Sequence, residues 1–262
     1  MPPVRCGILA LAGALGATTA LGQTEIGNHE IQKAQHFAAK GSRALRAGNF
    51  GAALPMFQKA LEAVPEFPDA HMGLGHVALR ERSYERALAA YRQAEEGYTA
   101  LGEAMFRRRL VEYDEAQEQI RNLRQELIEL HARANRTGSN ESEPGLTGLR
   151  IEQSIGHLEQ IQRPDRSDVT LAPAEVPFFI GNALMHLGRH AEAIDAWRAA
   201  LRRDPRFAPA YNNLAVALWK TGRVGQAHAC VARAEALGVV TNPAFKADLD
   251  RAGTAETGST CP

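Results

Sequence analysis

One pattern of small, aromatic and proline residues occurs four times in the chain, and it constrains the fold more than any other feature. Two copies end at Pro65 and Pro205, with matching residues at identical offsets before each proline. A shift of 34 residues leads from Gly41 to Gly75, and the same shift leads from Gly181 to Ala215. Such self-similarity is typical of repeat architectures. The matching positions hold Gly41, Ala53, Phe57, Ala60 and Pro65; Gly75, Tyr84, Ala87 and Tyr91; Gly181, Ala193, Trp197, Ala200 and Pro205; and Ala215 and Ala227.

The residue types at these positions favour pairs of closely crossing helices. Small residues such as Gly75 and Ala87 let two helices approach, aromatic residues such as Tyr91 fill the space between pairs, and prolines stop a helix. Gly188 can take the left-handed conformation that ends a helix. Apolar residues make up 45% of the chain and are mostly Ala and Leu, which are good helix formers. We therefore predict an all-α fold.

This pattern resembles the tetratricopeptide repeat, a helix-turn-helix unit of 34 residues. The resemblance covers about residues 34–101 and 174–241, and it departs from the family at Lys40, Thr99 and Val239. It implies a solenoid of helix pairs whose first helices line a concave surface. We expect an N-terminal repeat pair with a preceding helix at 23–101, a C-terminal pair at 174–241, a capping helix at 242–252 and a disordered tail at 253–262.

A different periodicity lies between the two pairs. Apolar or small residues recur there at alternating steps of three and four, as in a short coiled coil. We predict a long helix at 102–136 that could bend at Gly97 or Gly102, a flexible linker at 137–145, a short helix at 146–163 and a linker at 164–173. The two helices could fold back as a hairpin, or the seam could join separate chains. The seam residues are Tyr113, Ala116, Ile120, Leu123, Leu127, Leu130 and Ala134, and the short helix carries Ile151, Ile155, Leu158 and Ile161.

The first residues have the features of an export signal. Arg5 precedes an apolar stretch from Cys6 to Leu15, and Ala20 and Gly22 form a small-x-small cleavage site. We predict removal of residues 1–22 and a periplasmic or secreted protein, with a composition more typical of bacteria. An uncleaved signal anchor is the alternative, although the apolar run falls short of the ~20 residues of a spanning helix.

Two cysteines remain after signal removal. Cys230 and Cys261 could pair in an oxidising compartment. The sequence favours a different interpretation, in which Cys230 is a small buried residue of a helix and Cys261 lies in a free tail.

The chain lacks the residue patterns of an enzyme or a nucleic-acid-binding protein. Lys and Arg number 30, as do Asp and Glu, so no basic excess suits nucleic acid or an acidic membrane. His186 and His190 do not share a helical face, and no third ligand is evident. No motif for a nucleophile, a phosphate loop, zinc or a dinucleotide occurs. We predict no catalysis, metal, cofactor or small-molecule substrate.

The concave face of the C-terminal pair is the candidate site. Its amides suit a peptide backbone, and its aromatic residues suit apolar side chains. Asn182 and Asn213 match two asparagines of carboxylate-clamp repeat domains, but Phe178 stands in place of the first lysine, and Lys246 could supply a substitute cation. Phe178 and Trp219 could instead be covered by the insert helices or by another chain. The candidate residues are Phe178, Asn182, Met185, Asn212, Asn213, Trp219 and Lys246.

These features predict a non-catalytic scaffold or adaptor that binds a protein or an extended peptide. One alternative is an oligomeric spacer assembled through the seam at 113–134. Another is a chaperone-like or accessory subunit of an exported enzyme or envelope complex, which would need the same groove.

Overall fold

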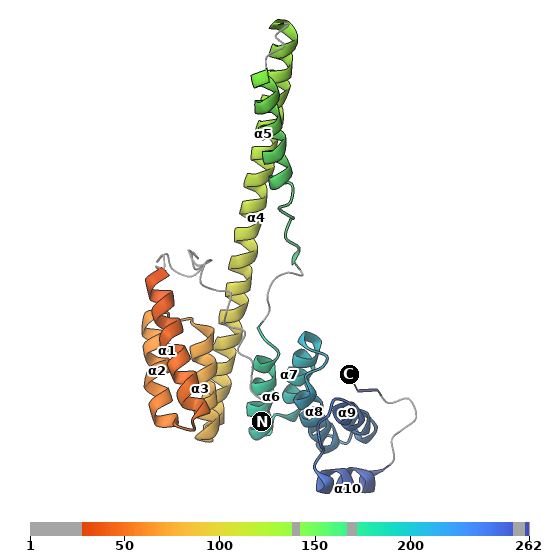
Figure 1. The fold of residues 1–262 in the computed structure, drawn as a ribbon. Helices are drawn as coiled ribbons and strands as arrows, with labels where there is room; N and C mark the ends of the chain where they lie inside the picture. Colours follow the sequence, from red (N-terminus) through yellow and green to blue (C-terminus); the bar gives the residue numbers. More distant parts are fainter. Residues whose placement is uncertain (1–27, 138–141, 167–171, 254–259, 262) are drawn as a thin grey trace. The chain divides into compact units, whose positions relative to one another are not determined.

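The computed structural model describes residues 28–137, 142–166, 172–253 and 260–261. These residues form ten α-helices, and no strand occurs among them (Figure 1). The predicted all-α class is therefore confirmed. The predicted signal peptide at 1–22 lies outside the described residues. The chain divides into a repeat unit, up to Ala100 and from Leu171 on, and an insert unit at Leu101–Thr170.

The N-terminal half of the repeat unit contains two helix pairs. They are α1 (Asn28–Arg46) with α2 (Phe50–Ala63), and α3 (Pro68–Arg80) with the first part of α4 (Tyr84–Thr137). The side chain of Asn49 caps α2 by accepting a hydrogen bond from the backbone N–H of Ala52 at 3.0 Å. Pro68 begins α3, where its missing N–H costs nothing.

The C-terminal half repeats this architecture. It contains α6 (Glu175–His186) with α7 (His190–Arg203), α8 (Ala208–Lys220) with α9 (Val224–Ala236), and a short final helix, α10 (Pro243–Ala252). Gly188 and Gly222 have φ of 75° and 77° in the turns inside the two pairs. Small side chains fill the crossing points of all four pairs, and Ala53, Ala87, Ala193 and Ala227 are each 0% exposed.

The glycines of the first helices lie against the aromatic residues of the second helices. A Cβ atom added to Gly75 would lie 2.5 Å from the Tyr91 ring, and one added to Gly181 would lie 2.5 Å from the Trp197 ring. Real Cβ atoms do not approach other atoms so closely. The close packing of each pair therefore depends on the absence of a side chain at these positions.

The second and third repeats pack directly on each other although the insert separates them in sequence. Tyr91 and Leu88 of α4 share one apolar core with Ile180 and Leu184 of α6. The rings of Tyr91 and Phe179 stack at 5.5 Å. The two predicted pairs therefore form one stack of four repeats. In the sequence, the insert follows repeat two and precedes repeat three.

The insert unit is a helical hairpin. Helix α4 is continuous over 54 residues and passes through Gly97 and Gly102 without a break. Helix α5 (Ser142–Leu158) runs back along it (Figure 1). Ile120 is 3% exposed and packs in a cluster with Ile151 and Ile155.

The helix bounds in the insert differ from the predicted ones. A linker was expected at 137–145 and a helix at 146–163, whereas α4 extends to Thr137 and α5 spans Ser142–Leu158. Pro144 falls in the first turn of α5, where proline is tolerated, so the helix can begin before the apolar face. Leu158 is the last side chain of α5 in the apolar cluster with α4, and the helix ends there. The centre of the expected linker, 138–141, lies outside the described residues.

Candidate partner-binding site

The candidate site lies on the first helices of the repeats, α1, α3, α6 and α8. Within the stack, α1 contacts α3 and α6 contacts α8, as expected for the inner wall of a curved solenoid. Residues four apart on one helix lie on the same side, so Phe178 and Asn182 share one side of α6. We call this side of the four helices the first-helix face.

Three asparagines on this face form a hydrogen-bonded amide chain. The Asn213 side-chain nitrogen donates to Asn182 Oδ1 at 2.8 Å, and the Asn212 nitrogen donates to Asn213 Oδ1 at 3.4 Å. The buried indole N–H of Trp197 donates to Asn182 Oδ1 at 3.2 Å and to the Phe178 carbonyl at 3.1 Å. The indole N–H thereby fixes the orientation of the Asn182 amide. It also connects the first-helix face to the core of the third repeat.

The amide chain leaves hydrogen-bonding capacity unused. Within the part of the chain that the structure describes, Asn182 Nδ2 and Asn212 Oδ1 have no partner. Both residues are half-buried. An unpaired amide group costs about 1–3 kcal/mol if it is fully desolvated. The face therefore offers a donor and an acceptor to water or to a ligand backbone.

Half-buried apolar side chains flank the amides. The Phe178 ring makes edge contacts with Phe207 at 5.1 Å and with Phe179 at 5.2 Å. Trp219 makes an edge contact with Phe245 of α10 at 5.7 Å. These ring partners all belong to the repeats and the final helix, and they leave each ring partly exposed. Met185, the remaining apolar candidate, is also half-buried, and its sulfur lies 3.2 Å from His190 Nδ1.

Lys246 is engaged elsewhere. Its amino group binds both carboxylate oxygens of Glu235 on α9, at 2.8 and 3.0 Å. This pairing raises the pKa of Lys246, chiefly through the hydrogen bond. Phe178, which stands in place of the first clamp lysine, has a ring that packs on other rings. The structure therefore joins Asn182 to Asn213, but in the described part of the chain neither Phe178 nor Lys246 supplies them with a cation.

The junction between the second and third repeats contains an equivalent cluster that the sequence did not predict. His76 takes the place of Asn182, Tyr91 that of Trp197 and Phe179 that of Asn213. The hydroxyl of Tyr91 shares a hydrogen bond with His76 Nδ1 at 2.9 Å, and the Phe179 ring meets the imidazole edge-on at 4.4 Å. Burial lowers the pKa of His76 from 6.5 to about 4. The signal available in the sequence was the shared register of repeats two and three, which places His76 and Tyr91 at the positions of Asn182 and Trp197.

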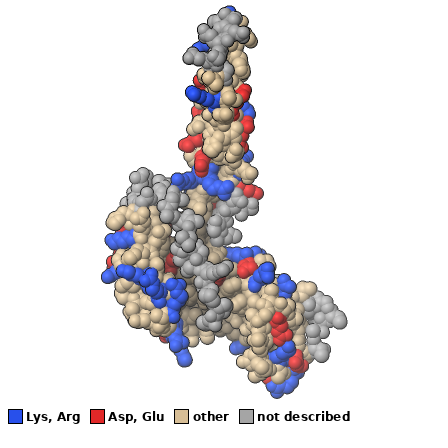
Figure 2. Space-filling view, in the orientation of Figure 1, with Lys and Arg blue, Asp and Glu red and all other residues tan. Residues whose placement is uncertain are grey.

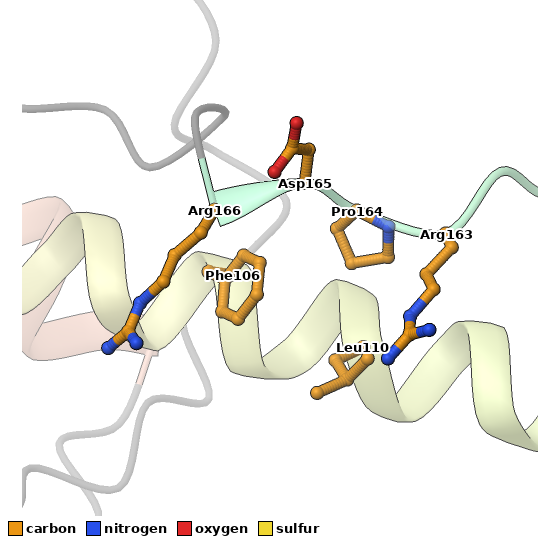
Figure 3. Close-up of a pocket in the computed structure, with 6 residues that line it drawn as sticks. All are labelled: Phe106, Leu110, Arg163, Pro164, Asp165 and Arg166. Carbon is orange, nitrogen blue, oxygen red and sulfur yellow. The ribbon is translucent and has the colours of Figure 1, made fainter.

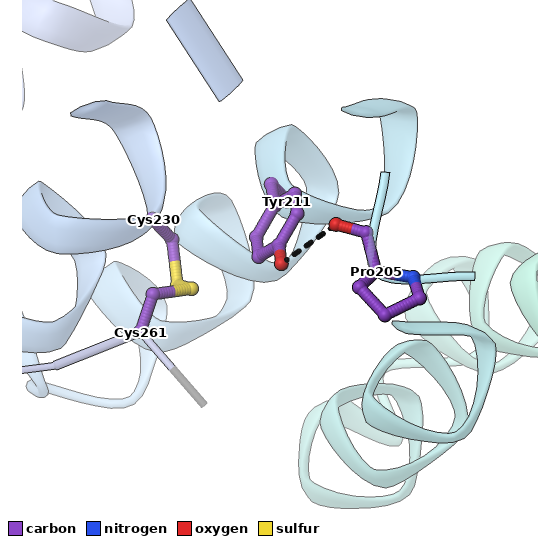
Figure 4. The surroundings of a disulfide bond; sticks show 4 residues. All are labelled: Pro205, Tyr211, Cys230 and Cys261. Carbon is purple, nitrogen blue, oxygen red and sulfur yellow. Dashed lines mark hydrogen bonds between the residues drawn. A yellow bond between two sulfur atoms is a disulfide. The ribbon is translucent and has the colours of Figure 1, made fainter. Parts of the chain in front are cut away.

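A disulfide joins Cys230 of α9 to Cys261, which corrects the expectation of a free tail (Figure 4). The two Cα atoms are 4.9 Å apart, and the side chain of Cys230 is fully buried. His228 Nε2 lies 2.9 Å from the carbonyl oxygen of Gly253, which also connects the end of α10 to α9. The cysteines are 31 residues apart, and this spacing does not determine how the segment between them runs. The sequence therefore could not predict the contact.

A pocket of about 420 Å³ lies in the insert unit between α4 and the segment that follows α5 (Figure 3). Phe106 and Leu110 form its apolar floor, and Arg166 pairs with Glu103 at 3.9 Å. The Asp165 carboxylate points away from Phe106 and Leu110. The lining residues are Phe106, Leu110, Arg163, Pro164, Asp165 and Arg166.

Metal-binding clusters and membrane-spanning helices are absent from the described residues. Among the described residues, no group of three or more His, Cys, Asp or Glu side chains is placed to hold a metal ion. No described helix is long and apolar enough to cross a membrane. Figure 2 shows acidic and basic side chains interspersed along the hairpin, so this view shows no surface of a single charge there.

Two segments of the chain match family models of the tetratricopeptide repeat. Residues 38–102 match one described as "Tetratricopeptide repeat", and residues 181–222 match one described as "TPR repeat". The chain therefore contains tetratricopeptide repeats on both sides of the insert. No curated protein matches the chain in sequence.

Three solved structures illustrate what the chain is similar to. TTC0263, a thermophilic TPR protein of Thermus thermophilus, is 19% identical over 84% of this chain and 98% of its own, with a TM-score of 0.36. The MamA 41-end fragment from Desulfovibrio magneticus RS-1 is 14% identical over 78% and 94%, with a TM-score of 0.29. YrrB, described as a TPR protein with an unusual peptide-binding site, is 18% identical over 80% and 88%, with a TM-score of 0.27.

Proposed function

We propose that this protein is a non-catalytic adaptor that binds an extended segment of a partner protein on the first-helix face of α6 and α8. One observation carries the proposal. The amide chain of Asn182, Asn213 and Asn212 is ordered by Trp197 yet keeps a free donor and a free acceptor between half-buried apolar side chains. Extended peptides need such backbone partners, and their side chains need apolar contacts beside them.

The oligomeric spacer is the weaker alternative. Leu123 and Leu127, which would join two chains in that interpretation, pack with Ile151 and Ile155 of the same chain. A seam that is occupied by its own α5 has less apolar surface to offer a second copy. An accessory subunit of an exported complex would use the first-helix face and is one form of the proposed adaptor.

We also infer that the protein acts outside the cytoplasm. The apolar N-terminal stretch with its small-x-small site supports export, and the disulfide between Cys230 and Cys261 supports an oxidising compartment. Cell fractionation with N-terminal sequencing of the purified protein tests this inference. Recovery of a chain that begins at Met1 from the cytoplasm, with both thiols free, would contradict it.

The adaptor function is tested by site-specific photocrosslinking. A photoreactive amino acid at Met185 should capture a partner, whereas the same group at Gln58, exposed on the second helix α2, should not. The partner's dissociation constant is then measured. Trp219→Ala should weaken binding by about 2 kcal/mol if the ring is a hot spot, and Asn212→Ala should weaken it less. Equal affinity of the parent and both variants, with each variant folded, would remove the face as the site.

A further inference from the structure

Each first helix ends in a basic residue or a histidine, and the four residues occupy one register. Arg46, Arg80, His186 and Lys220 are the last residues of α1, α3, α6 and α8. All four are exposed. They follow His76, Asn182 and the residues at the same register of the other two first helices, Ser42 and Val216, by four positions, so they lie on the same side of each helix. We call these four the rim residues.

Aromatic rings hold two of the rim side chains in place. The Arg80 guanidinium lies 5.5 Å from the centre of the Phe50 ring, and the His186 ring stacks on Tyr84 at 4.4 Å with 6° between the planes. Phe50 and Tyr84 are the first residues of α2 and α4, so both stacks join equivalent positions of successive repeats. The stack of His186 on Tyr84 joins repeats two and three, which the insert separates in the sequence.

The three rim cations have no acidic partner among the residues that the structure describes. Among the described residues, none of Arg46, Arg80 and Lys220 forms an ion pair. A cation at a helix C-terminus is favourable through the helix dipole, and this effect alone could place one there. The dipole does not explain the two ring stacks, which orient the side chains. Nor does it require a cation at every helix end, since the last turn of α2 has none.

The other edge of the face differs in charge. The first turns of α3 and α6 carry Asp69 and Glu175. Asp69 accepts a hydrogen bond from Tyr98, and burial raises the pKa of its carboxyl group, with the hydrogen bond opposing this effect. The free cations therefore follow one edge, beside the apolar side chains of Leu79, Met185 and Trp219, which directly precede three rim residues.

We propose that the rim selects a partner segment that is acidic on one side and apolar on the other. This inference rests on the proposed function and adds the chemistry of the partner. Neighbouring packed helices lie about 8–10 Å apart, and an extended chain advances about 3.3 Å per residue. One rim residue is therefore available for about every third residue of the bound segment, and acidic side chains at that spacing match the rim.

Three labelled peptides test the inference, made of repeated Glu-Leu-Ser, Gln-Leu-Ser or Lys-Leu-Ser triplets. The parent protein should bind the glutamate peptide about tenfold more tightly than the glutamine peptide, and the difference should shrink with added salt. The triple variant Arg46→Glu, Arg80→Glu, Lys220→Glu should lose this preference and bind the lysine peptide better. A matched triple variant on exposed residues of the second helices, Arg92→Glu, Arg202→Glu, Arg233→Glu, should behave as the parent does.

The outcomes separate this inference from the adaptor function. If the glutamate and glutamine peptides bind the parent equally, or if both triple variants change binding equally, the acidic partner is refuted. The adaptor function then stands, provided that Trp219→Ala weakens every peptide. If no peptide binds, both proposals fail. Tighter binding of a labelled oligothymidylate than of the glutamate peptide would also overturn the acidic protein segment as the occupant.

Discussion

Glu95 and Arg203 form an ion pair of 2.7 Å although 108 residues separate them in the sequence. Glu95 lies on α4 and Arg203 on α7, so the pair joins the second helices of repeats two and three. Both side chains are partly buried, at 33% and 19% exposure, which limits screening by water and salt. The junction between repeats two and three is therefore held by a specific polar contact as well as by the shared apolar core.

The first prediction concerns this ion pair. A double-mutant cycle with Glu95→Gln and Arg203→Met should give a coupling energy of about 1 kcal/mol, above the usual value for exposed pairs. Urea unfolding of the four proteins measures it. The same cycle on the more exposed pair of Glu30 and Lys33 provides the control and should give a coupling near zero. Equal coupling energies in both cycles would mean that the ion pair at the junction stabilises the fold no more than an exposed pair does.

The second prediction concerns the close helix crossings. Gly75→Ala should lower the free energy of unfolding by about 1–3 kcal/mol, because the new Cβ atom would overlap the Tyr91 ring. Gly51→Ala is the matched control, since nothing lies within 4 Å of a Cβ atom there and alanine favours a helix. It should leave stability unchanged or raise it by a few tenths of a kcal/mol. If the Gly75→Ala protein were as stable as the control variant, the helix crossing would have space for a Cβ atom and the prediction would be wrong.

The third prediction concerns acid. His76 is partly buried, and this burial lowers its pKa from 6.5 to about 4, so the unfolded chain binds a proton before the folded one does as the pH falls. Stability should therefore be complete above pH 6.5 and should decline as the pH falls from 6.5 to about 4, by about 3 kcal/mol from this group. His76→Asn, which introduces the residue found at Asn182, should remove most of this dependence. Parallel pH profiles for the parent and His76→Asn would refute the assignment.

The fourth prediction concerns the disulfide. Cys230→Ser would also leave a hydroxyl in the core, so Cys261→Ser is the cleaner variant. It should lower the free energy of unfolding by about 3 kcal/mol through the loss of loop closure. Hydrogen exchange should increase most in α10, which lies inside the loop that the disulfide closes. Addition of a reductant to the parent should reproduce the effect of the substitution, whereas the Cys261→Ser protein should not respond.

The sequence predicted the repeat fold well because the constraint at each crossing is steric and local. Only a small residue fits at Gly181 opposite Trp197, and the same requirement recurs in every repeat, so a single chain displays it four times. Helix bounds in the insert were less predictable. The apolar face of α5 is visible in the spacing of Ile151 and Ile155, but residues 142–145 are Ser-Glu-Pro-Gly, a composition that predicts a linker and not the start of a helix.

The candidate site was predicted in part. The positions of Asn182 and Asn213 follow from the repeat register, and the structure joins them by a hydrogen bond. The position of Lys246 depended on how α10 packs, which its sequence does not determine, and its pairing with Glu235 was not foreseen. The hydrogen bonds among the asparagines were not predicted either, and they use part of the capacity that we expected the amides to offer to a peptide backbone. The stack of Tyr84 on His186 joins residues on opposite sides of the insert, and no local pattern connects them.

The contact between Tyr91 and Phe179 has a consequence for how this chain could be rebuilt. Because this contact lies wholly within the repeat unit, the hairpin is inserted between two repeats that pack directly on each other. The solenoid can thus carry a passenger domain at this junction while repeats two and three keep their own packing. A fluorescent or affinity module could be grafted at the same junction. Partner binding to the first-helix face would then show whether the repeats had assembled correctly.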